Sequence, residues 1–215
     1  LAHSRATRMQ RQQLDIDKPS AKRAWAEVVK VKIANQATCL RLARLGDHER
    51  LESYSRRVRS GDTENMEAQA SAYYFPQLFG TGFHRAQERW SNAALDYGYA
   101  VLRGAIARGL VAHGFLPSIG LFHRSEQNAF NLADDVIEPF RPLVDLYVIN
   151  QLNAEIDAER ELSPADKVAL VGLLNVDVGM PRGMMSVLSA NEQRIEWFVS
   201  VYVCGSETQR ELPRQ

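Results

Sequence analysis

Apolar residues recur along most of this chain at the spacing of an α-helix, and this period limits the possible folds more than any other feature. The clearest run begins at Asp17-Lys18-Pro19, where proline fits the first helical turn because its missing N–H has no helical partner there, and it ends at Gly46. Its recurring apolar residues are Ala21, Trp25, Val29, Ile33, Ala37 and Leu40. No alternating pattern of useful length indicates a β-strand. The sequence therefore predicts an all-α, multi-helix fold.

Helix-start and helix-end signals predict further helices over 47–59, 63–80 and 91–113, and another from residue 125 to beyond 147 that Pro139 and Pro142 kink or interrupt. Two capping-box-like starts, at residues 163–166 and 189–192, predict the last helices. The 91–113 segment is rich in alanine and glycine, so we expect it to lie centrally in the core. We expect one helical domain over 1–205 and a frayed tail over 206–215.

Composition excludes several classes of protein. With 45% hydrophobic and 24% charged residues and no net charge, the 215-residue chain is not disordered. It has no apolar run long enough to span a membrane and no secretory signal. Its two cysteines, Cys39 and Cys204, suit a reducing cytoplasm. Residue 1 is Leu, which suggests a piece of a longer chain.

The absence of net charge hides an uneven distribution. Residues 1–60 hold 14 Lys/Arg and 6 Asp/Glu, whereas residues 61–215 hold 12 and 20. A basic block of this density can neutralise phosphates, and an acidic remainder can hold cations. Two solvated helix faces would give the same pattern.

The stretch 123–142 concentrates polar chemistry. On a helix, one side of it would carry Phe130, Ala133, Ile137, Phe140 and Val144, and the opposite side Asn128, Asn131, Asp134, Asp135 and Glu138. Asp135 and Glu138, three residues apart, repel each other unless a cation lies between them. Mg²⁺ prefers oxygen ligands and Mn²⁺ also accepts an imidazole, so His123 could complete a metal site. The alternative is a solvated acidic face beside an ordinary loop histidine.

Glu67 lies among small residues in the run MEAQASA, where two helices could approach closely or a ligand could reach the backbone. The alternative is a surface glutamate. We find no phosphate-binding glycine loop, no Gly-x-Ser-x-Gly and no His-Glu-x-x-His, so Ser/His/Asp hydrolysis has no support.

Three motifs resemble a known family: EAQASAYYF from Glu67, NAALDYGYAVLRGAIARGL from Asn92 and GLFHRSEQNAFNLADDVIEPFRP from Gly120. Together they are similar to the CRISPR-associated spacer-acquisition integrases, the universal first Cas proteins, in the compact form that accompanies single-effector systems. KIANQATCLRL from Lys32 and DKVALVGLLNVDV from Asp166 extend the resemblance over roughly residues 5–205.

The resemblance implies a C-terminal α-helical catalytic domain, with the family's N-terminal β-sandwich domain missing from this sequence. It also implies that Glu67, His123 and Glu138 are catalytic metal ligands for Mg²⁺ or Mn²⁺, with Asp135 as a possible further acidic residue. The implied reaction is attack by the 3′-hydroxyl of a captured DNA fragment on a phosphodiester of the CRISPR repeat. The implied partners are double-stranded DNA, a second copy in a homodimer and the small second Cas protein, in the prokaryotic cytoplasm near the nucleoid and with no membrane.

Basic residues of the first 60 positions are the candidates for DNA-backbone contacts, which would carry salt dependence and not sequence choice. They are Lys22, Arg23, Lys30, Lys32, Arg41, Arg44, Arg56, Arg57 and Arg59. Two other functions stay open: a structure-specific, metal-dependent DNA nuclease outside spacer acquisition, and a non-catalytic helical DNA-binding scaffold.

Overall fold

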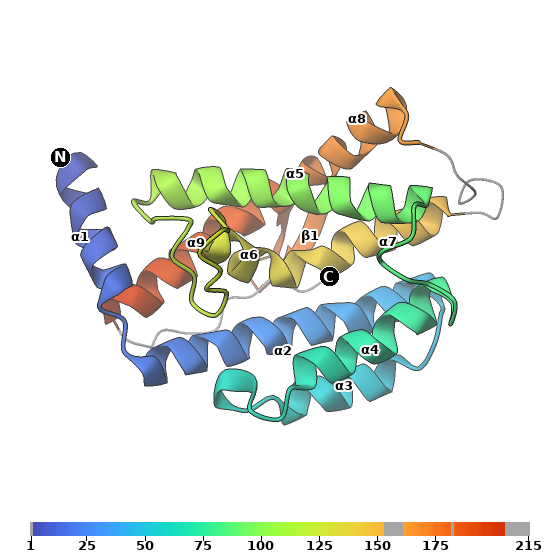
Figure 1. Cartoon of the computed structure of the whole chain (residues 1–215), viewed down its shortest axis with the longest axis horizontal. Helices are drawn as coiled ribbons and strands as arrows, with labels where there is room; N and C mark the ends of the chain where they lie inside the picture. Colours follow the sequence, from blue (N-terminus) through green and yellow to red (C-terminus); the bar gives the residue numbers. More distant parts are fainter. Residues whose placement is uncertain (1, 153–160, 182, 205–215) are drawn as a thin grey trace.

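The computed structural model describes residues 2–152, 161–181 and 183–204, which pack as helices around one apolar core (Figure 1). The α-helices are α1 (Ala2–Leu14), α2 (Lys18–Ala43), α3 (His48–Arg57), α4 (Met66–Phe79), α5 (Trp90–Ala112), α6 (Asn131–Ile137), α7 (Arg141–Gln151), α8 (Pro164–Gly172) and α9 (Val187–Cys204). Short 3-10 helices are η1 (Ser60–Asp62), η2 (Glu138–Phe140) and η3 (Leu173–Asn175). The all-α fold class predicted from the sequence is confirmed.

Helix α2 runs for 26 residues and packs against α3, α4, α7 and η2 (Figure 1). Asp17 caps its start, because the Asp17 carboxylate accepts a hydrogen bond from the backbone N–H of Ser20 at 2.8 Å. Arg44 ends it in the left-handed conformation at φ 56°. The helix predicted between Asp17 and Gly46 is therefore confirmed, and it forms one wall of the candidate site.

Helix α5 packs against α6, α7, α8 and α9, as its predicted central position requires. Its small residues allow close approach: a Cβ added at Gly98 would lie 2.5 Å from Cγ1 of Val144 on α7. This contact is shorter than van der Waals packing allows, so glycine at position 98 sets the distance between the two helices.

The helix predicted from residue 125 begins six residues later than expected. The Asn131 side-chain amide donates hydrogen bonds to the backbone carbonyls of Ser118, Ser125 and Asn128 at 2.9, 2.8 and 3.1 Å, and these bonds hold the preceding segment as a loop. The predicted interruption at the prolines is confirmed, because η2 contains Pro139 and α7 has Pro142 in its first turn. Phe130, expected on the apolar side, is 39% exposed.

Helix α1 was not predicted from the sequence, nor was an antiparallel hairpin of β1 (Asp177–Met180) and β2 (Gly183–Ser186), in which Asp177 pairs with Ser186. Each strand is only four residues long, too short for an alternating pattern to stand out. The capping box at Ser163 is confirmed, because its backbone N–H donates to Asp166 at 2.8 Å. The predicted tail 206–215 lies outside the described residues.

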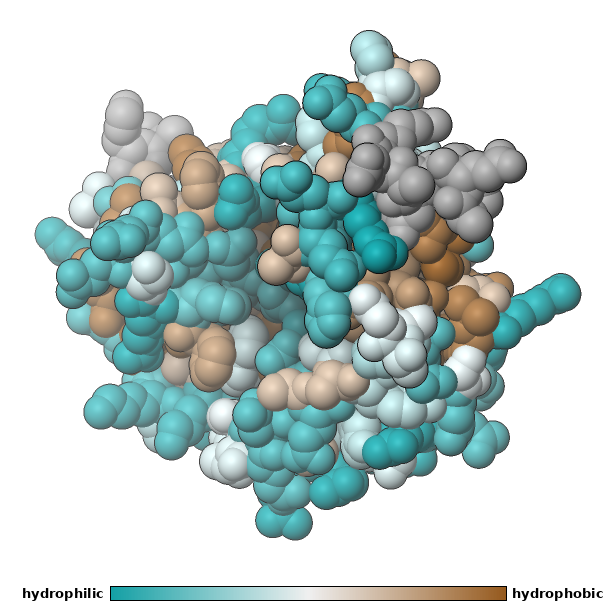
Figure 2. Space-filling model, turned by 45° about the vertical axis from the view of Figure 1, so that its right-hand side comes forward, coloured by the Kyte–Doolittle hydropathy of each residue, from teal (hydrophilic) through white to brown (hydrophobic). Residues whose placement is uncertain are grey.

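Hydrophilic residues cover most of the face drawn in Figure 2, which is expected when a helical bundle turns its apolar side chains inward. Within residues 2–152, 161–181 and 183–204, no helix combines the length and apolar character needed to cross a bilayer.

Candidate active site

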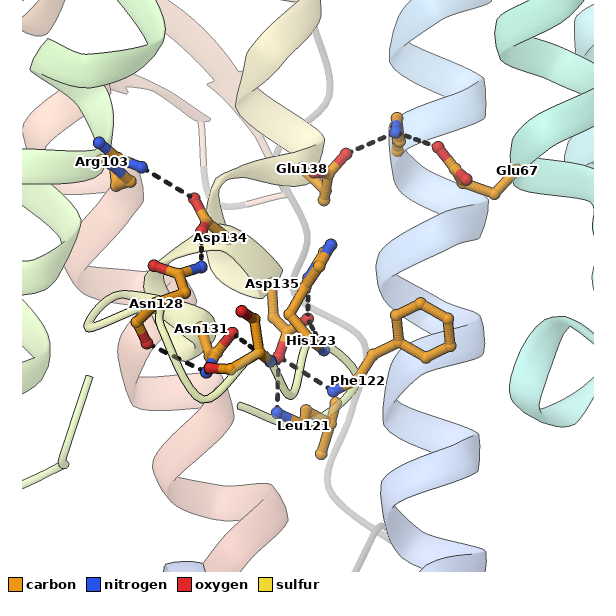
Figure 3. A network of polar contacts seen from close by, with 12 residues as sticks. Glu67, Arg103, Leu121, Phe122, His123, Asn128, Asn131, Asp134, Asp135 and Glu138 are labelled. Carbon is orange, nitrogen blue, oxygen red and sulfur yellow. Dashed lines mark hydrogen bonds and ion pairs between the residues drawn. The ribbon is translucent and has the colours of Figure 1, made fainter. Parts of the chain in front are cut away.

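The predicted site residues come from three different segments that flank α2: Glu138 and His123 lie on one side of this helix, and Glu67 extends toward it from the other side (Figure 3). Glu67 is in the first turn of α4, Glu138 is the first residue of η2, and His123 is in the loop between α5 and α6. Asn35 of α2 donates a hydrogen bond to the backbone carbonyl of Pro139 at 2.8 Å and so anchors η2 against α2. The fold thus brings together residues that are far apart in the sequence.

Lys32 of α2 joins the two glutamates. Its ammonium forms an ion pair with Oε2 of Glu138 at 2.5 Å and a second, shorter one with Oε1 of Glu67. The Lys32 side chain is only 10% exposed. Burial by itself lowers the pKa of Lys32, but the two carboxylates more than offset this effect and the pKa is raised. The charge of Lys32 is thus buried between two acids, whereas a DNA-backbone contact needs an exposed cation, and the DNA contact of Lys32 stays a prediction.

Glu138 is a buried, ionised carboxylate. Its Oε1 accepts a hydrogen bond from Nε of Arg141 at 2.8 Å, and its side chain is 7% exposed. Burial raises the pKa of Glu138. The positive charges of Lys32 and Arg141 have the opposite and larger effect, so the net pKa is lowered to about 2. Glu138 is thus a charged group inside the fold, and the alternative of a solvated acidic face does not apply to it.

Glu67 is less buried, with 30% of its side chain exposed. Asp62 caps the start of α4, because its carboxylate accepts hydrogen bonds from the backbone N–H groups of Met66 and Glu67 at 2.8 and 2.9 Å. Ser71, one turn further along α4, donates to Oε1 of Glu67 at 3.3 Å. The local fold therefore holds the Glu67 carboxylate toward α2, and it is not a free surface glutamate.

Asp135 fixes the loop that carries His123. Its fully buried carboxylate accepts hydrogen bonds from the backbone N–H groups of Leu121, Phe122 and His123 at 2.5, 3.0 and 3.2 Å (Figure 3). A Cβ at Gly120 would lie 2.2 Å from the carbonyl oxygen of His123, so the loop requires glycine there. The structure gives Asp135 the role of positioning the loop, in place of the direct metal contact considered from the sequence.

Asp135 also orients the imidazole of His123. Nδ1 of His123 lies 2.7 Å from Oδ1 of Asp135, and this hydrogen bond raises the pKa of His123 against the opposing effect of burial. The other ring nitrogen, Nε2, points toward the space beside Glu138 (Figure 3). A histidine whose Nδ1 is held by a carboxylate presents Nε2 to a metal in many metalloproteins.

The chemical types of the donor groups of Glu67, His123 and Glu138 suit Mg²⁺ or Mn²⁺, because they are two carboxylates and one oriented imidazole. No group of three His, Cys, Asp or Glu side chains in the described part of the chain is arranged closely enough to hold a metal ion as it stands. Positive charge already lies between the two glutamates, on the ammonium of Lys32. The position attracts a cation, and a metal ion at both carboxylates would have to replace the Lys32 contacts.

Comparison with known proteins identifies the chain. Residues 2–171 match the protein family described as CRISPR associated protein Cas1. The chain is also 45% identical, over 206 residues and 94% of its length, to the CRISPR-associated endonuclease Cas1 of Neisseria meningitidis serogroup C (strain 8013). The chain belongs to the Cas1 family. It spans 66% of the length of that Neisseria relative.

Solved structures share the fold. A casposase bound to an integration product superimposes with a TM-score of 0.73 and 17% identity, covering 94% of this chain and 70% of that one. A Cas1 protein from Thermotoga maritima gives a TM-score of 0.68 at 15% identity, covering 97% of this chain and 74% of that one. The helical arrangement of Figure 1 is therefore that of solved Cas1 proteins.

The other basic residues predicted to contact DNA lie on α2, on α3 and just after α3. All are exposed except Lys30, which is half-buried. Some are paired with acids: Lys30 with Glu27 at 2.8 Å, and Arg59 with Glu64 at 3.3 Å. An ion pair at the surface is weak in water, so a side chain such as Arg59 stays able to bind a phosphate.

Sequence reasoning missed the pairing of Lys32 and Arg141 with the site acids. A signal for Lys32 was present, because Val28, Lys32, Asn35 and Cys39 share one helical face and all are buried. A lysine at an apolar position of this kind needs an acidic partner, and two acids flank it here.

Proposed function

We propose that this chain is the catalytic part of a divalent-metal-dependent DNA endonuclease and integrase that inserts captured DNA fragments, or spacers, into a CRISPR array. The observation that carries the proposal is that Lys32 joins Glu67 to Glu138 beside α2, while Asp135 orients the imidazole of His123 in the adjoining loop. Membership of the Cas1 family and 45% identity to a protein named as an endonuclease support it.

Mg²⁺ or Mn²⁺ is the proposed cofactor, with Glu67, Glu138 and Nε2 of His123 as its ligands. When bound, it would supply charge stabilisation at a scissile phosphate and would lower the pKa of an attacking hydroxyl. Asp135 keeps Nε2 of His123 in place through the bond to Nδ1, and Arg141 holds the Glu138 carboxylate ionised and oriented. These contacts organise the site before substrate arrives, which is what efficient electrostatic catalysis requires.

The proposed reaction exchanges one phosphodiester for another. The 3′-hydroxyl oxygen of the captured strand forms a bond to a phosphorus of the repeat DNA, and the bond from that phosphorus to its original 3′-oxygen breaks. The attacking hydroxyl loses its proton and the leaving oxygen gains one, so no external energy source is needed. With water as the nucleophile, the same site would cleave DNA.

The proposed substrate is double-stranded DNA, both as captured fragment and as repeat. Its backbone would be bound by basic residues of α2, α3 and the segments that follow them, through contacts that weaken as salt rises. These residues are the half-buried Lys30 and the exposed Lys22, Arg23, Arg41, Arg44, Arg56, Arg57 and Arg59. We propose the small second Cas protein as a partner, because two similar solved structures are described as Cas6-RT-Cas1–Cas2 complexes. A second copy of the chain is a further proposed partner, which rests on the family resemblance alone.

A strand-joining assay tests this function. A short labelled duplex and a repeat-containing target duplex are incubated with the chain, alone and with the second Cas protein, with Mn²⁺ and with EDTA. Joined product should form only with the metal and should disappear in Glu138→Gln, while the exposed-acid control Glu126→Gln joins normally. Cleavage without joining would favour a nuclease outside spacer acquisition, and DNA binding without any metal-dependent reaction would favour a scaffold.

A further inference from the structure

Tyr99 of α5 contacts the residue that holds Glu138 in the candidate site. The guanidinium carbon (Cζ) of Arg141 lies 4.7 Å from the centroid of the Tyr99 ring, which is within the range of a cation–π contact. Nε of the same Arg141 side chain donates a hydrogen bond to Oε1 of Glu138 at 2.8 Å. One guanidinium therefore joins an aromatic ring of α5 to a carboxylate that we propose as a metal ligand.

A buried carboxylate and the packing of two helices hold the Tyr99 ring in place. The Tyr99 hydroxyl donates a hydrogen bond to Oδ1 of Asp145 on α7, and Oδ2 of Asp145 accepts another from the Tyr74 hydroxyl of α4 at 2.9 Å. Because position 98 is glycine, α5 lies close to Val144 of α7, and this contact brings Tyr99 next to Asp145. All three hydrogen-bonded side chains are buried, so water does not compete for these bonds.

The Tyr99 ring supplies a restraint that the contact with Glu138 lacks. Oε2 of Glu138 faces Lys32 at 2.5 Å, so Arg141 binds Glu138 through Oε1 and does not form a two-point contact with the carboxylate. A single hydrogen bond fixes the distance between two groups but leaves the guanidinium plane free to tilt, whereas a two-point contact would fix the plane as well. The face of the Tyr99 ring provides the second contact and restricts this tilt.

We propose that Tyr99 is a positioning residue of the candidate active site: its ring sets the orientation of the Arg141 guanidinium, which in turn directs the Glu138 carboxylate. The inference rests on the proposed function where it names Glu138 as a metal ligand. The orientation of Arg141 is a property of the chain without metal or DNA, so it can be measured separately from the reaction.

Hydrogen exchange at the Arg141 side chain tests the inference in the metal-free chain. The Nε–H of Arg141 is protected from exchange with water while it donates to Glu138, and heteronuclear NMR follows its signal. Tyr99→Leu removes the ring, and exchange at this Nε–H should become about fivefold faster or more, as expected for the loss of a desolvated cation–π contact. Tyr99→Phe keeps the ring, and its exchange rate should stay within about twofold of wild type.

Tyr97→Leu is the matched control, because Tyr97 is a half-buried tyrosine of the same helix while the Arg141 guanidinium lies over Tyr99. It should leave the Arg141 exchange rate unchanged. The backbone amides of α5 and α7 should keep their wild-type rates in Tyr99→Leu, because the proposed change is confined to the Arg141 side chain. A nuclear Overhauser contact between the Tyr99 ring and the Arg141 side chain is expected in wild type, and it checks the geometry even if Tyr99→Leu does not fold.

Strand joining gives a second readout. At saturating DNA and Mn²⁺, the rate constant of Tyr99→Leu should fall about fivefold or more while its DNA affinity stays at the wild-type value, and Tyr99→Phe should join near the wild-type rate. A loss of rate without a loss of affinity is expected for a residue that orients the site and does not bind DNA.

The inference is overturned if Arg141 exchanges equally fast in wild type and Tyr99→Leu, or if the backbone amides of α5 accelerate by the same factor. It is also overturned if wild type lacks the ring contact, or if Tyr99→Leu joins strands as fast as an active wild type. Faster Arg141 exchange in a chain whose wild type joins no strands would leave the orientation of Arg141 standing and remove the proposed function. Strand joining by wild type with unchanged exchange in Tyr99→Leu would do the reverse.

Discussion

The ammonium of Lys32 lies 2.5 Å from Oε2 of Glu138 and also contacts Glu67, so one buried cation joins two carboxylates from separate segments. The charges of Lys32 and Arg141 together balance those of Glu67 and Glu138. The charges of these four side chains therefore cancel, and a metal ion at the proposed site would compete with Lys32 for the two carboxylates.

Replacing Lys32 by methionine should separate the contribution of Lys32 to folding stability from its competition with a metal ion. Removing one partner of a buried ion pair leaves uncompensated charge, so the free energy of unfolding in EDTA should fall by about 3 kcal/mol. Because the ammonium no longer competes, we expect Mn²⁺ to bind at least about tenfold more tightly, each tenfold corresponding to about 1.4 kcal/mol. Urea unfolding and electron paramagnetic resonance titration of free Mn²⁺ measure the two quantities.

Lys167→Met serves as the control for this experiment, because Lys167 is an exposed lysine on α8. It should change neither quantity. An unchanged or weaker Mn²⁺ affinity in Lys32→Met would show that Lys32 supports the metal site and does not compete for it.

Asp135→Asn should impair the site through His123. An asparagine amide cannot accept all the backbone hydrogen bonds that the carboxylate accepts, and it no longer favours the Nδ1–H form of His123. Loss of such an outer partner typically lowers metal affinity or activity by roughly 10- to 100-fold, and we expect this range for Mn²⁺ binding and strand joining. Asp134→Asn, whose carboxylate instead contacts Asn128 and Arg103, should keep both near wild type. Equal effects of the two substitutions would argue against a specific role for Asp135.

Asp145 should make stability depend on pH. It is buried and accepts hydrogen bonds from Tyr74 at 2.9 Å and from Tyr99; burial raises its pKa to about 6 despite these bonds. Between pH 4 and 6 the folded state therefore binds more protons than the unfolded state, so stability falls as pH rises through this range, by up to about 3 kcal/mol. Asp145→Asn should flatten this part of the curve in urea unfolding at each pH. A slope that persists in the variant would assign the effect to other groups.

Replacing two glycines of α5 by alanine, one at a time, should change the free energy of unfolding in opposite directions. At Gly98 a Cβ would meet Val144 at 2.5 Å, so Gly98→Ala should lower the free energy of unfolding by about 1–3 kcal/mol through overpacking. At Gly104 a Cβ meets nothing within 4 Å, so Gly104→Ala should raise stability by about 0.5–1 kcal/mol, because alanine favours the helix. Urea unfolding of both variants checks the sign, and equal signs would contradict the packing described for α5 and α7.

Much of the fold could be predicted from the sequence, because helix periods and end signals are local. The run from Asp17 to Gly46 and the capping box at Ser163 appear as predicted. The start of α6 could not be predicted from the sequence, because it depends on hydrogen bonds from the Asn131 side chain to backbone carbonyls as distant as that of Ser118. The site was also only partly predictable. The residue pattern suggested Asp135, Glu138 and His123, and the family resemblance added Glu67, but the ion pairs of Lys32 come from packing between α2 and elements distant in sequence.

Helix α2 carries Trp25 to the ring of Phe122, Lys32 to the two glutamates and Asn35 to the backbone of Pro139. The regular pitch of α2 fixes the positions of these three residues relative to one another, and Trp25 and Lys32 are seven positions, or about 10 Å, apart along the helix. Inserting a single residue between Trp25 and Lys32 would rotate one end against the other by about 100° and translate it by about 1.5 Å. Homologous proteins that keep this site should therefore conserve the length of this stretch even where its side chains vary.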